Sequence, residues 1–219
     1  MSDFRYYRPN NFPPVVKNLI IINVLVWIAQ LIFDREGPYL TGRLTNLLAL
    51  YPIDSEEFRP YQIATHMFTH SNYTPYGQIV FQHILFNMFG LWMFGKMLEN
   101  VWGPKRFLLF YLVCGVGAAI AHLAVQYFTG GYSAAIGASG AVMGIFAAFA
   151  YLFPNTELFI MFIPIPIKAK WAVLGMAAID LFGGVTGGGN IAHFAHLGGA
   201  LTGFILVLIW NKTNRKRFY

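Results

Sequence analysis

The feature that most constrains this chain is a series of long apolar segments that carry almost no charge. A helix needs about 20 mostly apolar residues to cross a bilayer, and such runs recur along the whole sequence. Only 11% of the 219 residues are charged, whereas soluble domains have about 25%, so this chain cannot present an ordinary water-facing surface. We therefore predict an all-α membrane protein with six transmembrane helices. The predicted spans are residues 15–33, 78–97, 106–128, 134–153, 168–185 and 191–210.

The basic residues are distributed unevenly among the segments that join these spans. If the N-terminus is cytoplasmic, 12 of the 15 Lys and Arg residues lie on the cytoplasmic side, which is the positive-inside pattern. The other three, Arg35, Arg43 and Arg59, share the first outer loop with acidic residues. Both termini are therefore predicted to be cytoplasmic. The net charge of +6 is explained by topology, and no nucleic-acid partner is expected.

This topology divides the chain into three parts. Residues 1–14 form a short cytoplasmic segment, residues 15–210 form the six-span bundle, and residues 211–219 form a basic cytoplasmic tail. The first outer loop, 34–77, contains four prolines with aromatic residues between them. A loop of this length without structure is uncommon, so we expect it to be ordered and to lie partly in the membrane interface. The single cysteine, Cys114, excludes an intrachain disulfide.

Four polar residues on three of the spans fall at nearly the same depth. His83, Ser139 and His196 each lie about five residues from the outer end of spans two, four and six, which is roughly 8 Å below the surface. Asn87 follows one turn deeper than His83. Polar groups inside spans are energetically costly and usually functional, so this layer is the candidate active site.

The polar layer contains the groups that a serine hydrolase needs. A serine becomes a nucleophile when a base lies within hydrogen-bond reach, and histidine is the usual base. His83, the Asn87 amide and the backbone N–H groups around Ser139, including Gly137, can stabilise an oxyanion. No carboxylate lies at this depth on these three spans. The pattern therefore predicts a Ser139–His196 dyad, and it implies no metal and no cofactor.

Glycines beside both reactive residues strengthen this interpretation. A lone serine in a helix usually bonds back to a carbonyl one turn earlier, but Ser139 lies within Gly137-Ala138-Ser139-Gly140, which leaves room for another backbone. His196 is followed by Gly199-x-x-x-Gly203, a small-residue motif that brings helices into close contact. We expect spans four and six to cross closely and to place Ser139 beside His196.

At these residues the chain resembles the rhomboid family of intramembrane serine proteases. The matching motifs are His83-x-x-x-Asn87, Gly95-x-x-x-Glu99-x-x-x-Gly103, Gly137-Ala138-Ser139-Gly140, and Ala195-His196 followed by Gly199-x-x-x-Gly203. The resemblance implies a rhomboid-like bundle in which Ser139 is the nucleophile and His196 the general base. It also implies that His83 and Asn87 line an oxyanion hole, and that the substrates are transmembrane proteins with helix-breaking residues near the cleaved bond.

Two positions depart from the family pattern. Tyr61-Gln62 stands where the family often has Trp-Arg in the first outer loop, which leaves the residue that fixes this loop undetermined. Met143 stands one turn after the serine, where a tyrosine often stacks on the catalytic histidine. Neither change removes a group that does chemistry.

Several alternatives remain open at this point. His193, one turn before His196, is a competing base, and Asp180 near the outer end of span five is interpreted as interfacial. A zinc site would have to use His66, His70, His193 and His196, without the His-Glu-x-x-His helix of intramembrane metalloproteases. The other candidates are a rhomboid-like protein that binds membrane clients without cleaving them, and a transporter or channel. By analogy with minimal six-span members, a bacterial plasma membrane is the expected location.

Overall fold

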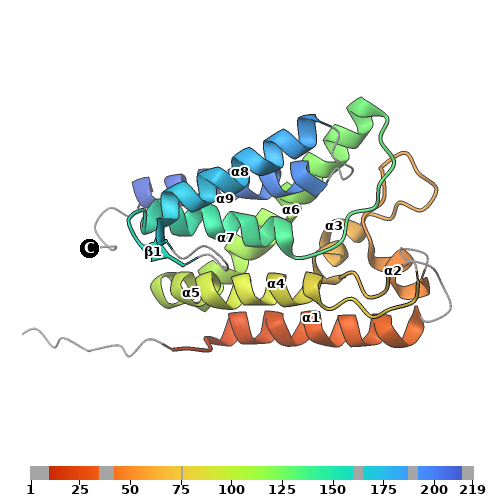
Figure 1. Ribbon diagram of the computed structural model, residues 1–219, viewed down its shortest axis with the longest axis horizontal. Coiled ribbons are helices and arrows are strands. Elements are labelled where there is room, and N and C mark those ends of the chain that lie inside the picture. The colour runs from red at the N-terminus through yellow and green to blue at the C-terminus, as the bar shows by residue number, and fades with distance from the viewer. Residues whose placement is uncertain (1–9, 35–41, 75, 160–164, 187–191, 214–219) are drawn as a thin grey trace, which may run out of the picture.

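The computed structural model describes residues 10–34, 42–74, 76–159, 165–186 and 192–213. Its long helices run roughly along one common direction (Figure 1). The antiparallel strand pair β1 (Glu157–Leu158) and β2 (Ile167–Lys168) lies at one end, and the short helices of the first loop lie at the other. The helices of the bundle are α1 (Pro14–Phe33), α6 (Pro104–Thr129), α7 (Ser139–Leu152), α8 (Ala169–Val185), α9 (Ala192–Thr213) and one continuous helical segment. That segment consists of α4 (Gln82–Gly90), the π-helical turn η2 (Leu91–Gly95) and α5 (Lys96–Trp102). The predicted segments 1–14 and 211–219 and the loop 34–77 lie partly outside the described residues.

Among the described residues, three helices are long and apolar enough to cross a bilayer. They are α1, α6 and residues His193–Lys212 of α9, while α7 is a shorter apolar helix. The structure is thus mostly helical with three candidate membrane spans, which agrees with the helical membrane fold predicted from the sequence. Two helices begin later than predicted, because residues 78–81 and 134–138 precede the first turns of α4 and α7 and belong to the loops. Ser139 is consequently the first residue of α7, and does not lie one turn inside a span.

Helices α7 and α9 cross in backbone contact, as the glycine spacing predicts. A Cβ atom added at Gly203 would lie 2.6 Å from the Gly144 carbonyl oxygen, and one added at Gly199 would overlap the Gly140 carbonyl. Any side chain at these positions would separate the helices. Small residues permit such an approach and give membrane helices much of their packing energy. This crossing brings together the ends of α7 and α9 on the side of the first loop, which are called the outer ends from here on.

At the opposite ends of the helices, called the inner ends, Glu99 joins α5 to α1. Its carboxylate oxygens accept hydrogen bonds from the backbone N–H groups of Val15, at 3.0 Å, and Val16, at 2.8 Å. These groups belong to the first turn of α1, where the helix itself supplies no acceptor. A carboxylate is also favoured there by the helix dipole. Glu99 thus caps α1 and fixes it to α5.

The first loop is ordered where it is described, and it carries the short helices α2 (Arg43–Leu48), α3 (Gln62–Thr65) and η1 (His66–Phe68). Polar residues of α1 hold it to the bundle. The Gln30 amide donates to the His70 carbonyl at 2.9 Å, and Asn23 Oδ1 lies 2.8 Å from His70 Nε2. Asp34, which follows α1, accepts a 2.7 Å bond from the Leu44 N–H. The loop is therefore part of the folded core at this end.

Gln62 fixes the loop internally, at the position where an arginine is common in the family. The side chain is 1% exposed. Its Oε1 accepts the Arg59 N–H at 3.1 Å, and its Nε2 donates to the Glu57 carbonyl, also at 3.1 Å. An amide satisfies both a donor and an acceptor of the backbone, whereas a guanidinium can only donate. Gln62 therefore supplies the loop-fixing role that the sequence left undetermined.

Candidate active site

Ser139 and His196 meet at the outer end of the α7–α9 crossing. The Ser139 Oγ lies 2.8 Å from His196 Nε2, which is a direct hydrogen bond. Both residues are partly buried. The structure therefore brings together the two residues that the sequence pattern selects as nucleophile and base.

The segment before α7 sets the position of Ser139. Ala135 pairs with Leu50 of the first loop through two backbone bonds of 2.8 and 2.9 Å, and the Gly137 N–H donates to the His66 carbonyl at 2.9 Å. The first loop thus holds the chain on the N-terminal side of Ser139. The Gly137 N–H is thus already bonded to the His66 carbonyl. What Gly137 contributes to the site is the space left by its missing side chain.

That space is bordered by His83 of α4. A Cβ atom added at Gly137 would lie 2.8 Å from His83 Nε2 and 3.6 Å from Ser139 Oγ, so both polar atoms border the same small volume. Gly137 has φ +114°, a conformation that favours glycine. The backbone N–H of Ser71 donates to His83 Nδ1 at 3.1 Å. Since an N–H can only donate, Nδ1 is the acceptor, and the neutral ring carries its hydrogen on Nε2, facing Gly137.

Asn87 lies one turn further along α4 and is buried at 6% exposure. Its Nδ2 donates to the His83 carbonyl at 2.8 Å, and one amide hydrogen remains. The Asn87 Oδ1 is buried and makes no hydrogen bond within the described part of the chain. Asn87 thus supports the turn that carries His83, and it keeps one donor for a further partner.

Asp180 of α8 belongs to this site, contrary to the interfacial position expected from the sequence. Its Oδ1 lies 3.1 Å from His196 Nδ1 and 2.8 Å from His193 Nδ1. The residue is 9% exposed. His193 therefore contacts the carboxylate, while His196 contacts both Asp180 and Ser139. The sequence offered one signal for this: a carboxylate inside an apolar span needs a partner.

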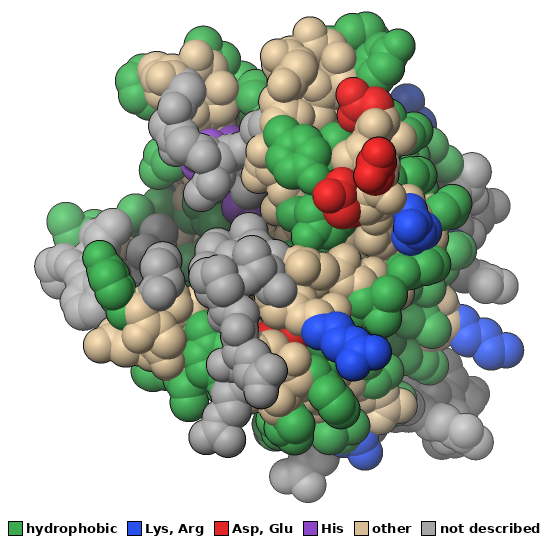
Figure 2. Space-filling view, turned by 90° about the vertical axis from the view of Figure 1, so that its right-hand side faces the viewer, with side chains coloured by type: hydrophobic (Ala, Val, Ile, Leu, Met, Phe, Trp, Pro, Cys, Tyr) green, Lys and Arg blue, Asp and Glu red, His purple; other side chains and the backbone are tan. Residues whose placement is uncertain are grey.

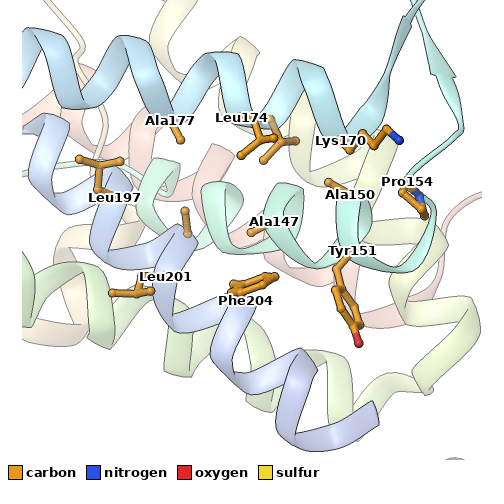
Figure 3. Close-up of a pocket in the computed structure, with 12 residues that line it drawn as sticks. Ala147, Ala150, Tyr151, Pro154, Lys170, Leu174, Ala177, Leu197, Leu201 and Phe204 are labelled. Atoms are coloured by element: carbon orange, nitrogen blue, oxygen red, sulfur yellow. The ribbon is translucent and has the colours of Figure 1, made fainter. Parts of the chain in front are cut away.

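The site lies at the end of the molecule that carries the first loop. Figure 2 looks onto this end and shows histidine atoms recessed between the surrounding segments. Deeper in the bundle, α7, α8 and α9 border an open apolar cavity of about 550 Å³ (Figure 3). Ala177 and Leu174 of α8 face Leu201 of α9 across it, and Lys170 lies at its inner end. None of the polar residues of the site lines this cavity.

The four histidines of the zinc alternative are divided between two places. His66 Nδ1 bonds the Gln62 carbonyl at 3.0 Å and His70 bonds Asn23, whereas His193 and His196 both contact Asp180. Within the described segments, no three His, Cys, Asp or Glu side chains are arranged to hold a metal ion.

Fold and site together define a helical membrane protein in which a serine hydroxyl is hydrogen-bonded to an imidazole at the outer end of the bundle. The sequence matches the family model described as Rhomboid domain over residues 57–212, a range that includes Ser139, His196 and the first-loop residue His66 that holds Gly137. The chain belongs to the rhomboid family.

The curated relatives that it resembles include the human presenilin-associated rhomboid-like protein, mitochondrial. That protein is 36% identical over 134 residues, which cover 58% of this chain and 35% of the relative. Rhomboid protein 1, mitochondrial, of Saccharomyces cerevisiae is 30% identical over 57% of this chain and 37% of the relative. RHOMBOID-like protein 12, mitochondrial, of Arabidopsis thaliana is 26% identical over 93% of this chain and 60% of the relative. The matches thus span about a third to three fifths of these relatives.

Proposed function

We propose that this protein is an intramembrane serine endopeptidase that cleaves transmembrane segments of other membrane proteins. The observation that carries the proposal is the 2.8 Å hydrogen bond between Ser139 Oγ and His196 Nε2, on helices held in contact by glycines. Rhomboid proteins are in general intramembrane serine proteases, and this chain keeps a nucleophile and a base in contact. Ser139 is assigned as nucleophile, His196 as base, and His83, Asn87 and Gly137 as the surroundings of the oxyanion.

In the proposed reaction the Ser139 hydroxyl passes its proton to His196 Nε2 while Oγ bonds to the scissile carbonyl carbon. The carbonyl electron pair moves onto oxygen. Donors for this oxyanion are the His83 Nε2–H and the Ser139 N–H, which lies at the N-terminus of α7 and has no acceptor within the helix. His196 then protonates the leaving nitrogen as the C–N bond breaks. The resulting ester on Ser139 is hydrolysed by a water that gives its proton to His196.

The proposed substrates are single-span proteins, with the lipid bilayer as the medium and no cofactor. A peptide bond within a helix is shielded by its own hydrogen bonds, so the substrate helix must unwind before Oγ can reach a carbonyl. Helix-breaking residues near the cleaved bond lower the cost of this step. Water must also reach a site below the membrane surface, and we expect it to enter at the loop end of the molecule, where Figure 2 shows histidine atoms set back from the surface.

The six-span count, the cytoplasmic termini and the membrane involved are parts of the same proposal. In the six-span arrangement, the continuous segment α4–η2–α5 and the helices α7 and α8 cross the bilayer together with α1, α6 and α9. A bacterial plasma membrane was predicted from the minimal six-span form, whereas the relatives named above are mitochondrial. Fractionation of the organism's membranes decides between these locations.

Labelling by a fluorophosphonate tests the endopeptidase proposal directly. We expect wild-type protein in detergent micelles to label at one site and to cut a helical substrate, and Ser139→Ala and His196→Gln to do neither. Ser139→Ala at unchanged thermal stability provides the control for folding. A wild-type protein that folds but neither labels nor cuts would contradict the proposal, and it would favour a rhomboid-like protein that binds membrane clients without cleaving them.

A further inference from the structure

The Asp180 carboxylate has no part in a Ser–His dyad, yet it contacts the proposed base directly. One oxygen, Oδ1, lies 3.1 Å from His196 Nδ1 and 2.8 Å from His193 Nδ1. We propose that Asp180 is a positioning residue that fixes His196 as the acceptor for the Ser139 proton, and that His193 holds the carboxylate in place. This inference rests on the proposed endopeptidase function.

The first argument concerns which nitrogen of His196 carries the hydrogen. An ionised carboxylate can only accept hydrogen bonds, so the Nδ1 atom of His196 must be the donor to Asp180. A neutral imidazole has a single N–H, and the hydrogen on Nδ1 therefore leaves Nε2 bare. Nε2 is the atom that lies 2.8 Å from Ser139 Oγ. Without the carboxylate, the other tautomer would place a hydrogen on Nε2 and could not take the serine proton.

The second argument concerns charge during the reaction. Once His196 holds the serine proton, the ring carries a full positive charge in a partly buried layer of the bundle. A charge taken out of water is costly unless an opposite charge lies beside it. The Asp180 carboxylate is already in contact with the ring, so no rearrangement is needed when the charge appears. Preorganised groups of this kind contribute strongly to catalysis.

The third argument explains why Asp180 can reach α9. The outer part of α8 carries Gly183 and Gly184 one turn after Asp180. A Cβ atom added at Gly183 would lie 2.8 Å from His193 Nε2, and one added at Gly184 would lie 2.9 Å from the Phe194 ring. The first turn of α9 therefore lies directly against α8. His193 is held between the Asp180 carboxylate and the α8 backbone, and its Nδ1 donates to the same oxygen.

A purely structural tie between α8 and α9 is the competing explanation. Lower down, the apolar cavity lies between these two helices (Figure 3), so a polar link at their outer ends also contributes to packing. The two explanations differ in what they predict. Loss of a tie reduces the folded fraction, whereas loss of a positioning group slows the reaction of molecules that remain folded.

The test compares Asp180→Asn, Asp180→Ala, His193→Leu and His193→Asn with the wild-type chain in detergent. Leu181→Ala, at a neighbouring α8 position that is 53% exposed, is the control. For each protein the rate and the end point of fluorophosphonate labelling, kcat and KM for a helical substrate, and Tm are measured. Asparagine can place a donor nitrogen where His193 Nδ1 lies, so His193→Asn should restore the contact that His193→Leu removes.

We expect Asp180→Asn to label to the same end point as the wild-type protein, but at least about 100-fold more slowly, since loss of the equivalent carboxylate in soluble serine proteases costs about 10⁴-fold in kcat. The fall should appear in kcat, with KM changed less than about 2-fold. His193→Leu should be slower than the wild type but faster than Asp180→Asn, and His193→Asn should recover most of the rate. Equal labelling rates for wild type and Asp180→Asn would overturn the inference while leaving the endopeptidase proposal intact.

If neither Asp180 variant reaches the labelling end point of the wild type, the two explanations are distinguished by a measurement on the wild-type protein. The imidazole ¹⁵N spectrum of histidine-labelled protein reports the tautomer, with the His196 signals assigned by their loss in His196→Gln. The inference requires a protonated Nδ1 and a bare Nε2 on His196. The opposite tautomer would refute it. Failure of the wild type to label at all would instead refute the endopeptidase proposal on which the inference rests.

Discussion

Gly137 is the residue of the site with the strictest geometric requirement. Its φ of +114° is rare for residues with a side chain, and the volume where a Cβ would lie is bordered by the His83 ring and Ser139 Oγ. The backbone there is held by the bond from the Gly137 N–H to the His66 carbonyl. The residue thus keeps open the volume in which an oxyanion would form.

Gly137→Ala should reduce kcat/KM by at least about tenfold, because the new methyl group would meet His83 at 2.8 Å on top of about 1–3 kcal/mol of backbone strain. Gly130→Ala is the matched control. Gly130 also has a positive φ, +66°, but has nothing within 4 Å of the added carbon. It should lose stability by about 1 kcal/mol and keep its activity. Activity is measured as kcat/KM and stability as Tm. Equal losses of kcat/KM in the two variants would mean that backbone strain, and not the contact with His83, causes the loss.

At the scale of elements, the α7–α9 crossing determines whether the serine and the imidazole meet. Backbone contact at Gly144 and Gly203 is possible only without side chains, and Ser139 lies five residues before Gly144 on α7. A shift of α7 relative to α9 at the crossing would therefore change the distance between Ser139 Oγ and His196 Nε2.

Gly203→Val should lower Tm by several degrees and abolish fluorophosphonate labelling, because the side chain would meet the Gly144 carbonyl at 2.6 Å or less. Gly175→Val on α8 is the control, since nothing lies within 4 Å of its added Cβ. That variant should label at the wild-type rate. Labelling of Gly203→Val at the wild-type rate would mean that Ser139 and His196 stay in contact when α7 and α9 are pushed apart, and it would contradict the role given to the crossing.

The first loop is the second element whose stability bears on the site, and it contains two buried histidines. Burial lowers the pKa of His66 to about 4 and that of His70 to about 3, whereas in the unfolded chain both titrate near 6.5. Between these values the unfolded state binds more protons than the folded one. Acid therefore favours unfolding, and stability falls as the pH drops below about 6.5.

We expect the free energy of unfolding to fall by about 2–3 kcal/mol per histidine between pH 7.5 and pH 4.5. Thermal unfolding in detergent at a series of pH values measures this. His66→Gln removes one titrating group and should show a smaller decrease in Tm over the same range. An unchanged pH dependence in that variant would contradict the assignment of the acid sensitivity to His66.

At the scale of the whole molecule, the proposed topology places the first loop outside and both termini in the cytoplasm. The sole cysteine, Cys114, is fully buried. The folded wild-type chain should therefore react little with thiol reagents, and single cysteines can be introduced without removing it. Tyr76, 91% exposed, reports on the outer loop, and Lys212 reports on the inner end of α9.

In intact cells a membrane-impermeant maleimide should label Tyr76→Cys and should label Lys212→Cys only after permeabilisation. The physical reason is the cluster of Lys and Arg residues near the inner helix ends, which resist transfer across the membrane. Each variant serves as the control for the other. Labelling of Lys212→Cys alone in intact cells would invert the proposed orientation.

Much of this fold follows from patterns along single segments of the chain. The apolar runs indicated helices in a membrane, and the spacing of Gly199 and Gly203 indicated a close crossing with the helix that carries Ser139. These features depend on hydropathy and on spacing within one helix, which the sequence displays directly.

The tertiary structure alone decided how the polar groups are connected. It placed Asp180 against His196, used Ser71 to set the tautomer of His83, engaged the Gly137 N–H with His66, and gave Gln62 the role of fixing the loop. Each of these contacts depends on the rotation of a helix about its axis or on the path of a loop. Both are set by packing between segments far apart in the chain, and a periodic pattern within one segment carries no information about them.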